Sequence, residues 1–239
     1  MLIHSFMIKL SRIKIDLFVE CPRCFYLDMV KKIKRPQVTP LNLNNAVDTL
    51  LKREFDIHRA AGTKHPLQIQ FGIDAFPSNH PQMNAWRQSM TAGVIHIDTE
   101  KEFHLHGGID DLWEDRNGVY YVVDYKATSK NEPVVKLEFW MKGFKRQVEI
   151  YQWLLRKNGL NVSDTAYFVY CNGDRTAEAF DNCIRFYCHI IPYKGNDKWI
   201  DSTLDKIYQC LHSSKIPEPG ANCDYCNYAL AYSQNIVNN

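Results

Sequence analysis

Apolar residues recur every three or four positions in four long segments, a spacing that predicts helices with one buried face. Ser11 is a typical residue to begin the first helix, and Gly159 is a typical residue to end the third. These helices are expected from Ser11 to about Cys21, over 43–61, from about 135 to 158, and from Ile200 to Leu211. A shorter helix is expected over 82–92. The residues expected to face the core include Ile13, Leu17, Val47, Leu50, Leu51 and Phe55.

Runs rich in β-branched and aromatic residues predict strands over 102–113, 118–127, about 165–171 and 184–192. Between the first two strands, Asn117-Gly118 is a strong signal for a hairpin turn. The order of helices and strands predicts an α/β fold, with a mixed central sheet flanked by helices. Because the 239 residues contain no repeat or linker, a single domain over residues 1–239 is expected.

The predicted hairpin would bring two acidic residues together. A turn centred near residue 117 places Asp110 opposite Asp124, where like charges repel each other unless a cation or a proton lies between them. Lys126 follows Asp124 by two residues and therefore projects from the same face of the strand. Two carboxylates and a lysine on one face form a candidate site for Mg²⁺ or Mn²⁺. The alternative is a surface hairpin with an ordinary acid–base pair across its strands.

Hydrolysis of a phosphodiester requires groups of this kind. A bound divalent cation makes water a nucleophile at neutral pH and offsets the charge that develops on phosphorus. A lysine beside the cation can orient the attacking water or stabilise the transition state.

Four of the eight cysteines form two Cys-x-x-Cys pairs, Cys21 with Cys24 and Cys223 with Cys226. Four thiolates suffice for a tetrahedral zinc ion or an iron–sulfur cluster, provided that the fold brings the pairs together. The alternative is that Cys21 and Cys24 are core residues that bind no metal. The remaining cysteines are expected to be free core residues, since disulfides are rare in the cytosol: Cys171, Cys183, Cys188 and Cys210.

Composition excludes several classes of protein. Apolar residues make up 45% of the chain and charged residues 23%, which is typical of globular proteins and excludes disordered and fibrous ones. No charge-free run reaches the roughly 18 residues of a membrane helix, and the first residues do not form a secretion signal. A cytoplasmic protein without membrane contact is therefore expected.

Four segments together resemble the PD-(D/E)XK nuclease superfamily, and in particular its RecB-like branch. Gly107-Gly108-Ile109-Asp110 and Val122-Val123-Asp124-Tyr125-Lys126 look like the core motif of the superfamily. Gln147-Val148-Glu149-Ile150-Tyr151 resembles the Gln-x-x-x-Tyr motif of the branch, and the segment from Ser11 to Leu27 is similar to its N-terminal part. The resemblance implies a restriction-endonuclease-like core. The branch includes CRISPR-adaptation exonucleases and nucleases coupled to helicases.

The resemblance implies roles for individual residues. Asp110 and Asp124 would bind Mg²⁺ or Mn²⁺ with the backbone carbonyl of Tyr125, and Lys126 would be the catalytic ammonium. Gln147 and Tyr151 would face the same site. Several members of the branch hold a 4Fe–4S cluster between one N-terminal cysteine and a C-terminal cysteine group, as Cys21 would with Cys223 and Cys226.

The sequence departs from the branch at two places. Asp48 stands where the early helix usually carries a histidine ligand, and an aspartate can still bind Mg²⁺ through oxygen. The alternative is that Asp48 is an ordinary residue at the rim of the core. A third C-terminal cysteine is absent, and Cys24 could replace it. Zinc then becomes an alternative to the 4Fe–4S cluster, because four thiolates suit both.

Together these patterns predict a metal-dependent deoxyribonuclease, with exonuclease favoured over endonuclease activity, that acts in DNA repair, recombination, or CRISPR or mobile-element processing. Its DNA would be single-stranded or have free ends, and a helicase or nuclease-complex partner is possible. The competing prediction is a catalytically silent module with the same fold that binds nucleic acid or another partner. Although the net charge of the chain is only +2, basic residues gather near its start, and these are expected to contact phosphates: Arg12, Lys14, Arg23, Lys31, Lys32, Lys34 and Arg35.

Overall fold

The structure is a computed structural model that describes residues 7–36, 42–89, 91–139 and 141–237. The chain forms two compact units, each built from segments that are separate in the sequence. Unit 1 comprises residues 1–39, 97–105 and 198–239, and unit 2 comprises residues 40–96 and 106–197. The expectation of a single domain over residues 1–239 stays a prediction.

Unit 2 is built around a five-stranded mixed sheet with the strand order β2-β5-β6-β7-β8. The strands are β2 (Phe76–Pro77), β5 (Asp111–Glu114), β6 (Tyr120–Thr128), β7 (Thr165–Gly173) and β8 (Phe186–Lys194). The pair β6 and β7 is parallel, whereas the other three pairs are antiparallel. The predicted α/β fold with a mixed sheet and flanking helices is therefore confirmed.

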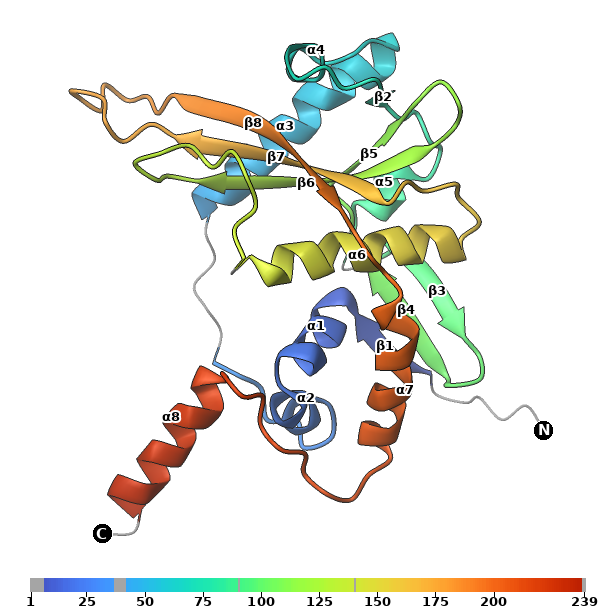
Figure 1. The fold of residues 1–239 in the computed structure, drawn as a ribbon, viewed down its shortest axis with the longest axis vertical. Coiled ribbons are helices and arrows are strands. Elements are labelled where there is room, and N and C mark those ends of the chain that lie inside the picture. The colour runs from blue at the N-terminus through green and yellow to red at the C-terminus, as the bar shows by residue number, and fades with distance from the viewer. Residues whose placement is uncertain (1–6, 37–41, 90, 140, 238–239) are drawn as a thin grey trace. The chain divides into compact units, whose positions relative to one another are not determined.

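Helices cover both faces of this sheet (Figure 1). Helix α3 (Asn42–Ala61) packs Leu51 and Phe55 onto a core that includes Trp113 and Tyr125. Leu50, expected on the same buried face, is 60% exposed instead. Helix α6 (Lys142–Lys157) covers the other face, and its buried residues run from Val148 to Leu155. Two short helices, α4 (Pro66–Gln70) and α5 (Met83–Trp86), also belong to unit 2.

Helix α6 begins later than the predicted start near residue 135. Val135 is 59% exposed and Phe139 is 80% exposed, so these two apolar residues of the preceding segment are not buried against the sheet. The apolar spacing there was misleading because a helix is stabilised by packing of its apolar face rather than by spacing alone.

Unit 1 is largely helical. It contains α1 (Arg12–Glu20), α2 (Pro22–Met29), α7 (Trp199–Leu211), α8 (Asp224–Tyr232) and the short π-helix η1 (Ser233–Val237). Helix α1 buries Ile15 and Phe18, whereas Ile13, which we expected in the core, is 62% exposed. Pro22 at the first position of α2 has no N–H to donate, which suits a helix start and separates α2 from α1.

The predicted strand over 102–113 is two strands in different sheets. Its first part is β4 (Phe103–Gly107), which lies between β1 (Ile8–Ser11) and β3 (Val94–Asp98) in a three-stranded sheet. Its second part is β5. Between them the Ile109 N–H donates to the carbonyl of Trp86 at 3.1 Å, which takes the backbone out of the first sheet.

Two of the four cysteines outside the Cys-x-x-Cys pairs are linked covalently. Cys171 of β7 lies directly opposite Cys188 of β8, and the two form a disulfide. The expectation that both are free core residues is wrong, because the strand register places them face to face. Cys183 is exposed rather than buried, and Cys210 is a buried free thiol as expected. No helix within the described residues combines the length and the apolar character needed to cross a membrane.

Candidate active site and four-cysteine site

The hairpin of β5 and β6 has the predicted register. Asp111 pairs with Val123 and Leu112 with Val122, which places Asp110, one residue before β5, beside Asp124. The Tyr125 N–H donates to Oδ2 of Asp110 at 3.0 Å, so the Asp110 carboxylate is tied to the edge of β6. The reversal occurs at Gly118, whose φ of +73° is accessible mainly to glycine.

Two glycines allow the chain to approach its neighbours before Asp110. A Cβ at Gly107 would lie 2.8 Å from Cε1 of Tyr151, and one at Gly108 would lie 2.5 Å from Cβ of Ser89. A side chain at either position would therefore force its neighbour or the backbone just before Asp110 to shift.

Asp124 and Lys126 form an ion pair on one face of β6. The Asp124 side chain is fully buried, and the Lys126 side chain is 16% exposed. Burial alone would lower the pKa of Lys126, but the carboxylates of Asp124 and Asp110 outweigh burial and raise it. Lys126 is therefore an ammonium at neutral pH, and it lies 4.8 Å from the ring centroid of Phe144.

Helix α3 contributes two further charged residues. Lys52 Nζ donates to Oδ2 of Asp48 at 2.8 Å and to Oδ1 of Asp110 at 3.0 Å, so it bridges the two carboxylates. Burial and the nearby Asp110 raise the pKa of Asp48. Burial would also raise the pKa of Asp110, but Lys52 and Lys126 reverse the effect and lower it.

A buried polar network lies behind these residues. The Asp111 carboxylate is completely buried and accepts hydrogen bonds from Arg59, from Arg87 at 3.2 Å and from the Tyr125 hydroxyl at 2.6 Å. Arg87 also donates to the Asp110 carbonyl at 2.9 Å. The network therefore joins α3, β5 and β6 and fixes the backbone on both sides of the acidic pair.

Helix α6 places the Gln-x-x-x-Tyr residues one turn apart. Gln147 Nε2 donates to the Tyr151 hydroxyl at 3.3 Å, and Tyr151 is buried against Gly107. The tyrosine is also close enough to Lys126 to influence its pKa. Both residues are thus positioned beside the acidic hairpin.

The carboxylates supply the oxygen donors that Mg²⁺ and Mn²⁺ prefer, and their charges suit a divalent cation. Asp48 and Asp110 already converge on one cationic atom, Lys52 Nζ. These distances of 2.8 and 3.0 Å to Nζ are longer than the bond of about 2.0–2.1 Å between Mg²⁺ and an oxygen ligand. The carboxylates fit a divalent cation chemically, and they would have to draw closer to share one.

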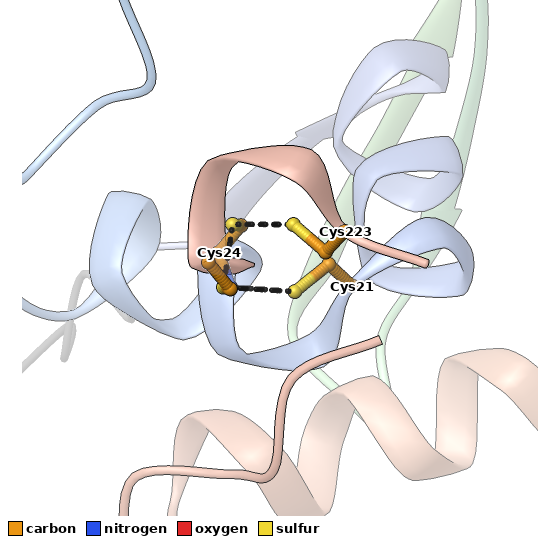
Figure 2. A group of neighbouring side chains, drawn as sticks. Cys21, Cys24 and Cys223 are labelled. Atoms are coloured by element: carbon orange, nitrogen blue, oxygen red, sulfur yellow. Dashed lines mark hydrogen bonds between the residues drawn. The ribbon is translucent and has the colours of Figure 1, made fainter. Parts of the chain in front are cut away.

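The two cysteine pairs meet inside unit 1, as expected. Figure 2 shows Cys21, Cys24 and Cys223 with their sulfurs facing one another. Cys24 Sγ lies 3.6 Å from the sulfurs of both Cys223 and Cys226, and Cys21 Sγ lies 3.7 Å from that of Cys226. The structure therefore brings together all four of the predicted ligands, in a group that could hold a metal ion.

Hydrogen-bond donors surround the sulfurs. Cys21 Sγ accepts from the Gly220 N–H at 3.2 Å and from the Cys24 N–H at 3.4 Å, and Arg35 donates to Cys223 Sγ at 3.3 Å. Burial opposes ionisation of Cys21, but the two backbone donors lower its pKa to about 7. A thiolate stabilised in this way is a ready metal ligand.

The sequence profile of the PD-(D/E)XK nuclease superfamily matches residues 9–230, nearly the whole described chain. The chain belongs to this superfamily. Among solved structures, one titled "Crystal structure of SSO0001" is 14% identical, with a TM-score of 0.38, and the match covers 96% of this chain and 87% of that chain. No curated protein matches the sequence significantly. Membership in the PD-(D/E)XK superfamily implies nuclease activity and a nucleic-acid substrate, and this superfamily generally uses divalent metal ions.

The basic residues expected to contact phosphates fall into two groups in this PD-(D/E)XK protein. Members of the first group have partners within the protein: Lys14 pairs with Asp28, Arg23 donates to the Pro217 carbonyl, and Arg35 pairs with Glu20. Arg12 is half-buried. The second group is exposed after helix α2 and consists of Lys31, Lys32 and Lys34.

Sequence reasoning missed two features of the PD-(D/E)XK site. Lys52 follows Asp48 by four residues, and this helical spacing for an ion pair was a signal that could have revealed it. The Asp111 network has no local signal, because its partners Arg59 and Arg87 come from separate segments.

Proposed function

We propose that this chain is a metal-dependent deoxyribonuclease of the RecB-like branch, acting on single strands or free DNA ends. The observation that carries the proposal is the convergence of Asp110, Asp124 and Lys126 on one hairpin, with Asp48 beside them. The superfamily match supports the same reaction class. Repair, recombination and CRISPR or mobile-element processing are the processes that use such enzymes.

Asp110 and Asp124 would hold Mg²⁺ or Mn²⁺, with Asp48 and the Tyr125 carbonyl as further ligands. The bound cation would supply a nucleophilic water at neutral pH and offset charge on the phosphate. Lys126, kept charged by its carboxylate neighbours, would donate a hydrogen bond to the attacking water or to a phosphate oxygen. The Tyr151 hydroxyl and the Gln147 amide would orient the scissile phosphate.

A digest of end-labelled DNA tests this proposal. The wild-type protein should cleave with Mn²⁺ and not with EDTA, and Asp124→Asn should be inactive while Glu132→Gln, an exposed acidic residue of the same unit, retains activity. Equal digestion by wild type and Asp124→Asn would contradict the proposal. Binding of DNA by an inactive wild-type protein would favour the second candidate, a silent nucleic-acid-binding module. A circular DNA substrate has no free ends, so an endonuclease cuts it and an exonuclease does not.

The four cysteines would form a structural metal site in this enzyme. A single ion with Zn–S bonds of about 2.3 Å has sulfur–sulfur edges of about 3.8 Å in a regular tetrahedron. The observed sulfur distances of 3.6 and 3.7 Å support one zinc ion. In a 4Fe–4S cluster each thiolate binds a different iron, so the four cysteine sulfurs lie further apart than around a single ion. Only the resemblance to the RecB-like branch favours that cluster.

Metal analysis of protein purified without oxygen decides between these cofactors. One zinc per chain and a colourless solution are expected. About four irons per chain with a brown colour would favour the cluster. Metal-free, folded protein would show that the cysteines are core residues.

A further inference from the structure

A lysine that the proposed chemistry does not use lies between two of the candidate metal ligands. Lys52 Nζ is 2.8 Å from Oδ2 of Asp48 and 3.0 Å from Oδ1 of Asp110. The Lys52 side chain is only 22% exposed, so these carboxylates replace most of the water around its charge. The second lysine of the site, Lys126, is paired with Asp124.

Each oxygen of Asp110 accepts a hydrogen bond. Oδ2 accepts a hydrogen bond from the Tyr125 N–H, a donor fixed in β6, and Oδ1 accepts from Lys52. The Tyr125 N–H cannot leave without distorting the sheet, whereas a lysine side chain has four rotatable bonds. A cation that bridges Asp48 and Asp110 would lie where the Lys52 ammonium bridges the same two carboxylates, so it must displace that ammonium.

We propose that Lys52 is a built-in counter-ion of the candidate metal site, which holds Asp48 and Asp110 together in the metal-free protein and releases them when Mg²⁺ or Mn²⁺ binds. This inference rests on the proposed function, because it requires those carboxylates to be metal ligands. Lys52 then has two effects. It prevents repulsion between Asp48 and Asp110 without metal, and it weakens metal binding because its two charged hydrogen bonds must be broken first.

Calorimetric titration of the full-length protein with MnCl₂ tests the proposal. Lys52→Met removes the ammonium and keeps an unbranched side chain, and Arg53→Met removes an exposed charge from the next residue of the helix. Lys52→Met should bind Mn²⁺ roughly tenfold more tightly than wild type, because Mn²⁺ no longer has to break the charged hydrogen bonds of an ammonium group. Arg53→Met should bind as wild type does. Lys52→Gln serves as a second variant if Lys52→Met does not fold.

Thermal unfolding gives a second measurement. In EDTA, Lys52→Met should melt below wild type because Asp48 and Asp110 repel each other, and saturating Mn²⁺ should close the gap. A general electrostatic effect would tighten Mn²⁺ binding without lowering the melting temperature in EDTA, and that result would overturn the proposal. Equal or weaker Mn²⁺ binding by Lys52→Met would also overturn it.

Asp110→Asn separates failure of this inference from failure of the proposed function. If wild type shows Mn²⁺ heat that Asp110→Asn lacks, the metal site exists and the Lys52 variants decide the inference. If no protein shows Mn²⁺ heat that depends on Asp110, both the metal site and the role of Lys52 are wrong.

Discussion

Asp111 shows how a single buried charge supports the candidate active site without belonging to it. Its carboxylate is inaccessible to solvent, and two guanidinium groups that are themselves almost buried, those of Arg59 and Arg87, depend on it. Without Asp111 these two guanidinium groups would share one partly exposed carboxylate, that of Asp56, and this loss of buried charge pairing costs far more than losing a surface ion pair.

The variant Asp111→Ala should therefore lower the free energy of unfolding by about 3–5 kcal/mol. Asp74→Ala breaks an ion pair to Lys64 in which the aspartate is 81% exposed, and it should change stability little. Urea denaturation of both variants measures the difference. If Asp111→Ala were as stable as Asp74→Ala, the network would have no structural importance.

Asp56 makes stability depend on pH in a predictable direction. Burial would raise its pKa, but ion pairs with Arg87 and Arg59 at 2.8 and 3.0 Å lower it. The folded state therefore binds this proton more weakly than the unfolded state, whose aspartate pKa is about 3.9. The resulting stabilisation is complete above that pH and is lost as the pH falls through the folded pKa.

Comparison of wild type with Asp56→Asn tests this sign. The wild-type protein should have the higher urea midpoint at pH 7, and its advantage should shrink as the pH falls from about 4 toward 2. An advantage that grew on acidification would mean that the carboxyl group is stabilised in its protonated form.

Gly220 is the residue that brings a backbone donor to the cysteines. A Cβ there would lie 2.1 Å from the carbonyl oxygen of Glu20, so an alanine must move the N–H away from Cys21 Sγ. Gly220→Ala should lose bound metal and melt at a lower temperature than wild type. Asn222→Ala, an exposed change in the same loop, should retain both properties. Full metal content in Gly220→Ala would show that the loop can shift freely.

At the scale of elements, the parts predicted correctly are those with local causes. The register of β5 and β6 follows from a turn that a single glycine at residue 118 permits, so Asp110 and Asp124 could be placed together from the sequence. The division of 102–113 into β4 and β5 depends on Trp86 and Ser89, which are distant in the sequence. The disulfide between Cys171 and Cys188 was likewise unpredictable, because a long connection separates their strands.

The same distinction applies to the candidate site. The hairpin residues and the cysteine pairs are recognisable by spacing, and the structure brings each group together. The contact between Lys52 and Asp110 depends on how α3 packs on the sheet, for which the sequence gives only the apolar pattern of Leu51 and Phe55.

The exposed segment after α2 gives a prediction about DNA binding. If Lys31, Lys32 and Lys34 contact duplex phosphates, changing all three to Glu should flatten the log–log dependence of affinity on salt by about 0.9 for each phosphate that is no longer neutralised. A variant with Lys198, Lys206 and Lys215 changed to Glu has the same net charge and should keep the wild-type slope. Identical slopes in the two variants would show that the segment is merely solvated.

At the scale of the whole molecule, the four-cysteine site joins chain segments that are far apart, since Cys24 and Cys223 are separated by 199 residues. Closing a loop of this length lowers the entropy of the unfolded chain by an amount worth about 4–5 kcal/mol, if the model for disulfides applies to a metal site. A strong chelator and Cys223→Ser should therefore lower the melting temperature by similar amounts. In buffer without added Mg²⁺ or Mn²⁺, the chelator should have no further effect on Cys223→Ser, and an additive effect would mean that a metal outside the four-cysteine site stabilises the fold.

The division of unit 1 among three chain segments also sets an order of events during translation. At about 5–20 residues per second, Cys24 leaves the ribosome roughly 10–40 s before Cys223 follows it. All of unit 2, with every acidic residue of the candidate active site, is synthesised in that interval. A chain whose synthesis stops between residues 126 and 223 therefore carries the acidic residues and lacks two of the four cysteines. Metal at the four cysteines consequently marks a polypeptide whose synthesis has passed residue 226.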